Sequence, residues 1–174
     1  QMEDLPAPAN QAQAGDLTTF EACEHTFGKQ KIDAQCATLT VPENWDDPTS
    51  RLTTLPVVRI PSIRASPTEP VFILLGGPGS SNFYFMPKDW LLANRDVVMV
   101  GYRGVDGSVD LKCQDILDVS AKHLGKSFLT KQSTAELQAA TEKCAVSLQE
   151  SGVDLNGYTV KAVVQDMEAA RTAM

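Results

Sequence analysis

The sequence has little positive charge, few aromatic residues and no long hydrophobic run. Its 174 residues include 15 Lys and Arg against 22 Asp and Glu, and the formal net charge is −7. Nucleic-acid binding depends on basic patches, so this composition argues against nucleic acid as a partner. No apolar run approaches the roughly 18 residues that a membrane-spanning helix needs, and no membrane span is expected.

The sequence also lacks a C-x-x-C motif and a visible export signal. Without C-x-x-C, neither a zinc ribbon nor a thioredoxin-type redox centre is expected, and no metal or other cofactor is predicted. The absence of a charged segment followed by an apolar core fits both a cytosolic protein and the mature form of an exported one. Residues 1–19 are rich in Pro, Ala and Gln and indicate a flexible leader before a folded domain.

Four cysteines favour an oxidising, extracytoplasmic compartment, either secreted or periplasmic. They are Cys23, Cys36, Cys113 and Cys144. An even number together with a polar leader favours two disulfides. Closeness in the sequence favours a Cys23–Cys36 bond, which leaves Cys113 to pair with Cys144. The alternative is four buried thiols in the core of a cytosolic protein.

Two β-rich stretches in the first third predict an antiparallel pair of strands. Residues 37–42 alternate and are β-branched, and residues 51–61 form a second strand after a turn rich in Asn, Asp and Pro. Pro56 inside the second strand indicates an edge position or a bulge. Residues 20–36 are polar and read as irregular.

The remaining elements predict a parallel sheet with flanking helices. Residues 71–75 and 96–102 are continuous apolar runs, typical of strands buried on both faces, and a short helix is expected between them. A capping box, Ser133-x-x-Glu136, predicts a helix, and Thr159 is the expected N-cap of a last helix. The fold class is therefore α/β, with an antiparallel hairpin leading into a parallel sheet. The expected apolar faces of the two helices are Leu137, Ala140, Cys144 and Leu148 on the first, and Val160, Val163, Val164, Met167 and Ala170 or Arg171 on the second.

The stretch Leu75-Gly76-Gly77-Pro78-Gly79 ends the first apolar run. The carboxyl end of a parallel strand lies on the side where open α/β sheets bind ligands, and glycines let a ligand approach main-chain N–H groups. Such donors stabilise an oxyanion or cradle a phosphate. The stretch matches neither phosphate motif, G-x-x-x-x-G-K-[ST] or G-x-G-x-x-G, which disfavours a phosphate. The remaining alternative is a simple Gly/Pro turn.

Four motifs in order resemble one enzyme family. LLGGPGSS resembles the H-G-G-P-G strand end of the proline iminopeptidase and tripeptidyl aminopeptidase group of α/β-hydrolases, and RDVVMVGYRGVDGS resembles its D-x-R-G-x-G-x-S strand end. CATLTVPENWDDP with LPVVRIP resembles the N-terminal hairpin of exported bacterial members. YTVKAVVQDMEAARTAM resembles the helix before the nucleophile strand. The resemblance covers residues 20–174 and implies the N-terminal half of an α/β-hydrolase fold.

The resemblance assigns roles to residues of two loops. It implies that the backbone N–H of Gly77 is an oxyanion donor and that Gly76 and Gly79 set the conformation of the turn. Arg103 and Gly104 shape the neighbouring loop near the substrate; alternatively, Arg103 only hydrogen-bonds loop carbonyls. Two positions depart from the family pattern, because Leu75 stands in place of His and Gly101 in place of Asp.

The reacting groups of such an enzyme are not found in these residues. A serine hydrolase of this fold needs a G-x-S-x-G elbow, an acid and a His. Ser80, Ser81 and Ser108 lack that context, and His25 and His123 are expected on the surface. The segment should therefore be inactive alone, and its expected partner is the C-terminal half of the same protein.

These features predict the N-terminal part of an exported serine hydrolase. The expected enzyme is a peptidase that releases residues from peptide N-termini, through serine attack on a carbonyl with His as the general base. Its expected substrate is a peptide or a small ester or amide. The alternatives are an esterase of the same fold and a non-catalytic exported binding domain that retains the hydrolase scaffold.

Overall fold

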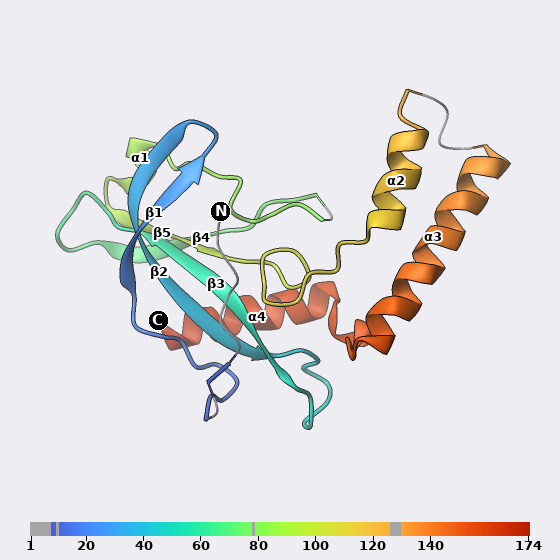
Figure 1. Ribbon diagram of the computed structural model, residues 1–174. Helices are drawn as coiled ribbons and strands as arrows, with labels where there is room; N and C mark the ends of the chain where they lie inside the picture. Colours follow the sequence, from blue (N-terminus) through green and yellow to red (C-terminus); the bar gives the residue numbers. More distant parts are fainter. Residues whose placement is uncertain (1–7, 10, 78, 126–129) are drawn as a thin grey trace. The chain divides into compact units, whose positions relative to one another are not determined.

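The computed structural model describes residues 8–9, 11–77, 79–125 and 130–174 (Figure 1). The chain divides into two compact units. The first consists of Gln1–Asp110 and Tyr158–Met174, and the second of Leu111–Gly157. No helix among the described residues is both long and apolar enough to cross a membrane.

The first unit is built on a mixed sheet of five strands in the order β1-β2-β3-β5-β4. The strands are β1 (Glu21–Phe27), β2 (Gln30–Pro42), β3 (Leu52–Ile60), β4 (Thr68–Ile73) and β5 (Arg95–Val100). The pairs β1–β2, β2–β3 and β3–β5 are antiparallel. Strands β4 and β5 are parallel and are connected through the short helix α1 (Asp89–Leu92). The predicted α/β class, antiparallel pair and parallel pair are therefore present.

The polar segment before residue 37 is a β-hairpin, and its interpretation as irregular was wrong. β1 and β2 pair from Glu21↔Cys36 to Phe27↔Gln30, and Gly28 opens the two-residue turn with φ +62°. Alternate residues of β2, including Ile32, Ala34 and Cys36, contribute to one hydrophobic cluster. The alternation is present in the sequence, since the polar residues Lys31, Asp33 and Gln35 alternate with these three.

Pro56 lies in an internal strand, which corrects the expected edge or bulge. β3 pairs with both β2 and β5, and the β3–β5 ladder ends at Val57↔Val100. One position further, the Pro56 carbonyl accepts the N–H of Gly101 at 2.8 Å. The missing N–H of proline therefore falls where the ladder has ended, so β3 tolerates it.

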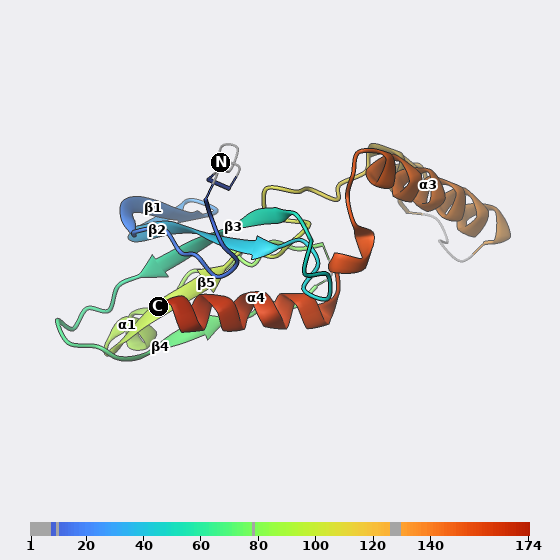
Figure 2. The same ribbon diagram turned by 90° about the horizontal axis from the view of Figure 1, so that it is seen from below.

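Helix α4 lies along one face of the sheet (Figure 2), and hydrophobic clusters cover both faces. On one face, strand residues such as Leu39, Val57 and Val100 pack with Met167 and Ala170 of α4 (Val160–Ala173). On the other face, the strands pack against α1 and the segment before it. The members of this second cluster include Val58, Val97, Met99, Phe83, Phe85, Leu91 and Leu92.

Two predicted burial patterns are wrong, the second only in part, because Met167 and Ala170 of α4 pack against the core as predicted. β4 is an edge strand, and Val71, Phe72 and Ile73 are only half-buried, because β4 pairs on one side with β5 alone. Helix α4 buries Ala162, Asp166 and Ala170. Val160 and Val164, expected on the buried face, are 83% and 59% exposed.

Part of the expected leader is attached to the sheet. Gly15 and Thr18 donate backbone hydrogen bonds to carbonyls of Thr40 and Thr38 in β2, at 2.8 and 3.0 Å. Residues 1–7 and 10 of the leader lie outside the described residues.

The second unit consists of α2 (Gln114–Lys122), α3 (Lys131–Glu150) and the 3-10 turn η1 (Leu155–Gly157). Helix α3 begins earlier than the capping box predicted, because Thr130 is its N-cap and accepts the N–H of Ser133 at 3.1 Å. Leu137, Ala140, Cys144 and Leu148 form its less exposed face, as predicted. A disulfide joins Cys113 to Cys144 in this unit.

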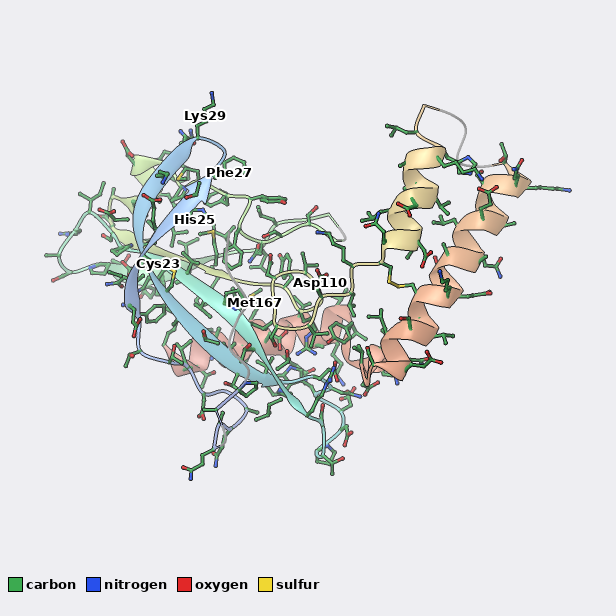
Figure 3. All side chains as sticks on the ribbon, viewed as in Figure 1. Cys23, His25, Phe27, Lys29, Asp110 and Met167 are labelled. Carbon is green, nitrogen blue, oxygen red and sulfur yellow. A yellow bond between two sulfur atoms is a disulfide. The ribbon has the colours of Figure 1, made fainter. Side chains whose placement is uncertain are left out.

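The other disulfide, Cys23–Cys36, joins β1 to β2 (Figure 3). Both bonds are the pairs expected from closeness in the sequence. Two disulfides are compatible with a secreted protein, because such bonds persist in oxidising compartments.

Candidate functional site

The glycine loop follows the carboxyl end of β4, on the path to α1. Gly77 and Gly79 have φ angles of +106° and +77°, which favour glycine, and the Gly77 carbonyl accepts the N–H of Ser80 at 3.0 Å. Gly76, Gly77 and Gly79 are exposed, and Pro78 lies outside the described residues. Among the described residues, the Gly77 N–H has no hydrogen-bond partner.

The base of the glycine loop is held at Leu75 from two sides. The side-chain oxygen of Asn82 accepts the Leu75 N–H at 3.0 Å, and the Tyr102 hydroxyl donates to the Leu75 carbonyl at 2.9 Å. Burial raises the pKa of Tyr102, which keeps the hydroxyl protonated as a donor. Leu75 is thus positioned through its backbone, which any residue type provides.

Asn82 also joins the ends of the parallel strands. It is fully buried, and its amide nitrogen donates to the carbonyls of Ile73 and Val100 at 2.9 and 2.8 Å. A buried amide with every hydrogen bond made is costly to replace. The side chain therefore fixes where β4 ends relative to β5.

Arg103 and Gly104 lie on the loop after β5, and Gly104 has a φ of +75°. The guanidinium of Arg103 is buried and donates to the Glu43 and Pro42 carbonyls at 2.5 and 3.2 Å. It also forms a bidentate ion pair with Asp166 of α4, at 2.7 and 2.5 Å. These contacts correspond to the alternative in which Arg103 holds loop carbonyls.

A buried polar network surrounds that ion pair. Trp45 donates its ring N–H to Asp166 at 2.8 Å, and burial raises the Asp166 pKa while Arg103 opposes that shift. Glu43, 1% exposed, accepts two hydrogen bonds from Arg51 and one from the Tyr158 hydroxyl. Burial, followed by the Glu43 carboxylate, raises the Tyr158 pKa well above its usual range. The network fastens α4 to the end of β2.

The serine and histidine candidates have structural partners. The Ser108 hydroxyl hydrogen-bonds the Thr53 hydroxyl at 2.8 Å and accepts the Thr54 N–H at 3.0 Å. His25 and His123 are buried, which corrects their expected surface positions. His25 Nε2 contacts the carbonyl of Phe85 at 2.7 Å. His123 Nε2 contacts Glu136 at 2.9 Å.

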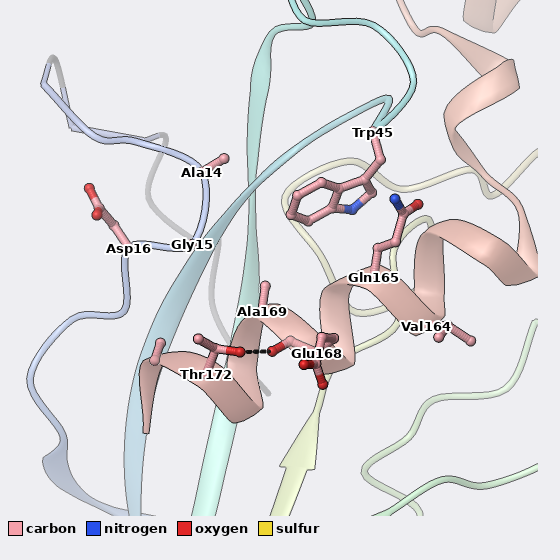
Figure 4. A pocket seen from close by; sticks show the side chains of 10 residues that line it. Ala14, Gly15, Asp16, Trp45, Val164, Gln165, Glu168, Ala169 and Thr172 are labelled. Carbon is pink, nitrogen blue, oxygen red and sulfur yellow. Dashed lines mark hydrogen bonds between the residues drawn. The ribbon is translucent and has the colours of Figure 1, made fainter.

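Two cavities of the first unit lie away from the glycine loop. The larger, of about 620 Å³, lies between residues 14–16, Trp45 and α4 (Figure 4). The smaller, of about 560 Å³, is lined by the N-terminal segment and by threonines of β2 and β3. Within the described part of the chain, no cluster of three or more His, Cys, Asp or Glu is placed to hold a metal ion.

The sequence analysis missed the polar residues that support the loops. Asp166 could have been found, because Ala162, Asp166 and Ala170 follow helical i, i+4 spacing and place it on the same stripe as two small residues. Asn82 and Asp106 gave no comparable signal, because their side chains bind backbone groups: Asn82 binds carbonyls at the ends of β4 and β5, and Asp106 binds N–H groups of two loops.

No protein-family model matches this chain. A search of curated proteins found no match either.

Proposed function

We propose that the chain is the N-terminal part of an exported serine hydrolase of the proline iminopeptidase and tripeptidyl aminopeptidase group. The observation that carries the proposal is the N–H of the exposed residue Gly77, which has no partner among the described residues and belongs to a loop whose base is held at Leu75. An oxyanion donor needs this combination, because preorganised N–H groups stabilise developing charge without reorganising during the reaction.

The order of elements supports the same proposal. In α/β-hydrolases one oxyanion N–H comes from the loop between the third strand and the first helix. Here the glycine loop runs from β4 towards α1, and β4 is the third strand counted from β2. The antiparallel β2–β3 pair precedes the parallel β4–β5 pair, which is the order that the four motifs imply.

In the proposed reaction a serine attacks the carbonyl of a peptide near its N-terminus. The Gly77 N–H donates to the oxygen that becomes negatively charged, while a histidine, oriented by an acid, takes the serine proton. The serine, histidine and acid are supplied by residues outside Gln1–Met174. Esters of the same acyl groups are the competing substrates.

A fluorophosphonate probe applied to the full-length protein tests the proposal. The expected result is covalent labelling of one serine outside residues 1–174, located by peptide mapping, with Ser80, Ser81 and Ser108 unmodified. Aminoacyl and tripeptidyl anilides compared with p-nitrophenyl esters separate a peptidase from an esterase. If the probe does not label the folded full-length protein, the proposal is contradicted and a non-catalytic binding domain is supported.

Substitution of Gly77 tests the donor itself. Gly77→Ala forces a side chain onto a φ of +106° and places its Cβ 3.0 Å from the Ser80 hydroxyl oxygen, so the N–H must move. Loss of one oxyanion donor costs roughly 10²–10³ in kcat, and we expect a fall of at least about tenfold. Gly28→Ala is the matched control, because Gly28 also has a positive φ but lies in the β1–β2 turn.

A further inference from the structure

Asp106 links the two residues that hold the glycine loop. A single carboxylate oxygen of Asp106 accepts the backbone N–H of Asn82 at 3.1 Å and that of Tyr102 at 2.8 Å. Asn82 and Tyr102 are the residues whose side chains bind the N–H and the carbonyl of Leu75. One carboxylate thus lies behind both contacts to the base of the loop.

We propose that Asp106 is a positioning residue that orients the Gly77 N–H through Asn82, Tyr102 and Leu75. The steps from Asp106 to Leu75 are hydrogen bonds between described residues. The last step follows the chain, because Leu75 lies two residues before Gly77. With both of its backbone polar groups bound, Leu75 cannot rotate without breaking a partly buried hydrogen bond. The inference rests on the proposed function, since a defined Gly77 N–H matters most if it meets an oxyanion.

The geometry around Gly101 supports the inference. A Cβ added at Gly101 would lie 2.7 Å from the Asp106 Cβ and 2.7 Å from Pro56 Cδ, so no side chain fits there beside Asp106. The resembled motif D-x-R-G-x-G-x-S has Asp at the position of Gly101 and Gly at the position of Asp106. In this chain the two residue types are exchanged, with Gly at position 101 and Asp at position 106, and the two positions are close neighbours. The loop therefore keeps one carboxylate, which Asp106 supplies in place of residue 101.

A local role for Asp106 is the competing explanation. Its own backbone N–H donates to the Tyr102 carbonyl at 2.8 Å, so the residue also closes the turn 102–106. A role confined to this turn affects the amides that Asp106 touches. A positioning role also affects Leu75, which Asp106 does not touch.

Amide hydrogen exchange, measured by NMR on the full-length protein, separates these roles. In Asp106→Ala we expect exchange at Leu75 to accelerate at least about tenfold, while Val98 and Val100 in the β5 ladder keep their protection. In Asp106→Asn the side-chain oxygen still accepts both N–H groups, so Leu75 should stay protected. Asp33→Ala, which removes an exposed carboxylate from β2, is the control. Faster exchange at Asn82 and Tyr102 with an unchanged Leu75 overturns the proposal.

Kinetics give a second readout. Asp106→Ala should lower kcat about tenfold or more with little change in KM, and Asp106→Asn should restore kcat, because the substitution affects transition-state stabilisation rather than substrate binding. If Asp106→Ala does not fold, Tyr102→Phe removes only the hydroxyl bound to Leu75. We then expect a shifted Gly77 amide resonance and a lower kcat, and an unchanged resonance overturns the proposal.

The two proposals fail separately. A Leu75 response to Asp106→Ala in a protein that no fluorophosphonate labels supports the positioning role and contradicts the hydrolase. If the enzyme is labelled and active but Asp106→Ala changes neither Leu75 exchange nor kcat, the hydrolase is supported and the positioning role is contradicted.

Discussion

The two units of this chain are stabilised in different ways. In the first, strand residues such as Leu39, Leu55 and Val57 are 0% exposed, on a sheet with hydrophobic clusters on both faces. In the second, the most buried hydrophobic residues that the structure describes are Ala140, Cys144 and Val153, at 7%, 8% and 8%. Units below about 70–80 residues seldom bury enough apolar surface alone, and cross-links compensate. We therefore expect the sheet unit to depend mainly on its core and the helical unit mainly on its disulfide.

The first unit also contains an ion pair that is buried on both sides. Arg103 and Asp166 are each 2% exposed in their side chains, whereas Lys143 and Asp115 of the second unit are 70% and 47% exposed. A buried charge that loses its partner is left without water, but an exposed one is solvated. A substitution that breaks the Arg103–Asp166 pair should therefore cost more stability than one that breaks an exposed pair of either unit.

The largest effect is expected from Asp166→Ala. It leaves the Arg103 guanidinium buried without its carboxylate and removes the acceptor of the Trp45 ring N–H. Breaking a buried pair in this way costs about 3–5 kcal/mol of the free energy of unfolding. Both tryptophans, Trp45 and Trp90, lie in the first unit, so urea unfolding followed by tryptophan fluorescence measures this unit alone.

Glu168→Ala on the same helix is the matched control. Glu168 pairs with Arg171, and both side chains are about 60% exposed, so the unfolding midpoint should hardly change. Equal losses in the two variants would show that the burial of Asp166 has no energetic consequence.

The second-largest effect on stability is expected from removal of a disulfide. Replacing Cys113 and Cys144 by Ser opens a connection with a sequence separation of 31, worth about 3–4 kcal/mol by chain entropy. Because the second unit has little core, we expect α2 and α3 to unfold. Limited proteolysis should then cut within Leu111–Gly157, while tryptophan fluorescence stays native.

Removal of the disulfide of the first unit tests whether the two units depend on their disulfides to different degrees. Replacing Cys23 and Cys36, separated by 13 residues, removes about 3 kcal/mol by the same reasoning. The sheet should remain folded with a lower urea midpoint. Helices α2 and α3 that resist proteolysis without Cys113–Cys144 would contradict the proposed dependence on the cross-link.

The sequence predicted the elements whose burial follows a simple period. The strands of the β2–β3 pair, β5 and the less exposed face of α3 were found, because their apolar residues recur on one or both faces. β1 was missed because most of its residues are polar, and one of them, His25, is buried and contacts the Phe85 carbonyl. The face of α4 was misplaced, because a charged residue, Asp166, takes an inward position that periodicity assigns to an apolar one.

The candidate site was predictable only in part, for a physical reason. Glycines at a strand end mark a place where backbone geometry matters, and Gly77 and Gly79 do have positive φ angles. The supporting contacts join Leu75 to Asn82 and Tyr102, and Asn82 to Val100. Such contacts depend on which strands are neighbours, and a single sequence does not encode that order in a local pattern.

The smallest effect is a pH dependence in the second unit. Glu136 accepts hydrogen bonds from Lys122, His123 and Gln132, and these contacts, Lys122 first, lower its pKa from 4.5 to about 2. The pKa is lower in the folded state, so the ionised carboxylate stabilises that state above about pH 4.5, and this contribution disappears as the pH falls towards 2. Pepsin should therefore cleave within Leu111–Gly157 faster as the pH falls from about 4.5 towards 2.

Glu136→Gln should weaken this acceleration, whereas Glu142→Gln, at an exposed position on the same helix, should retain it. A carbon-13 titration of the Glu136 carboxyl with a midpoint near 4.5 would contradict the explanation, because it would mean that the contacts to Lys122 and His123 do not favour the ionised form.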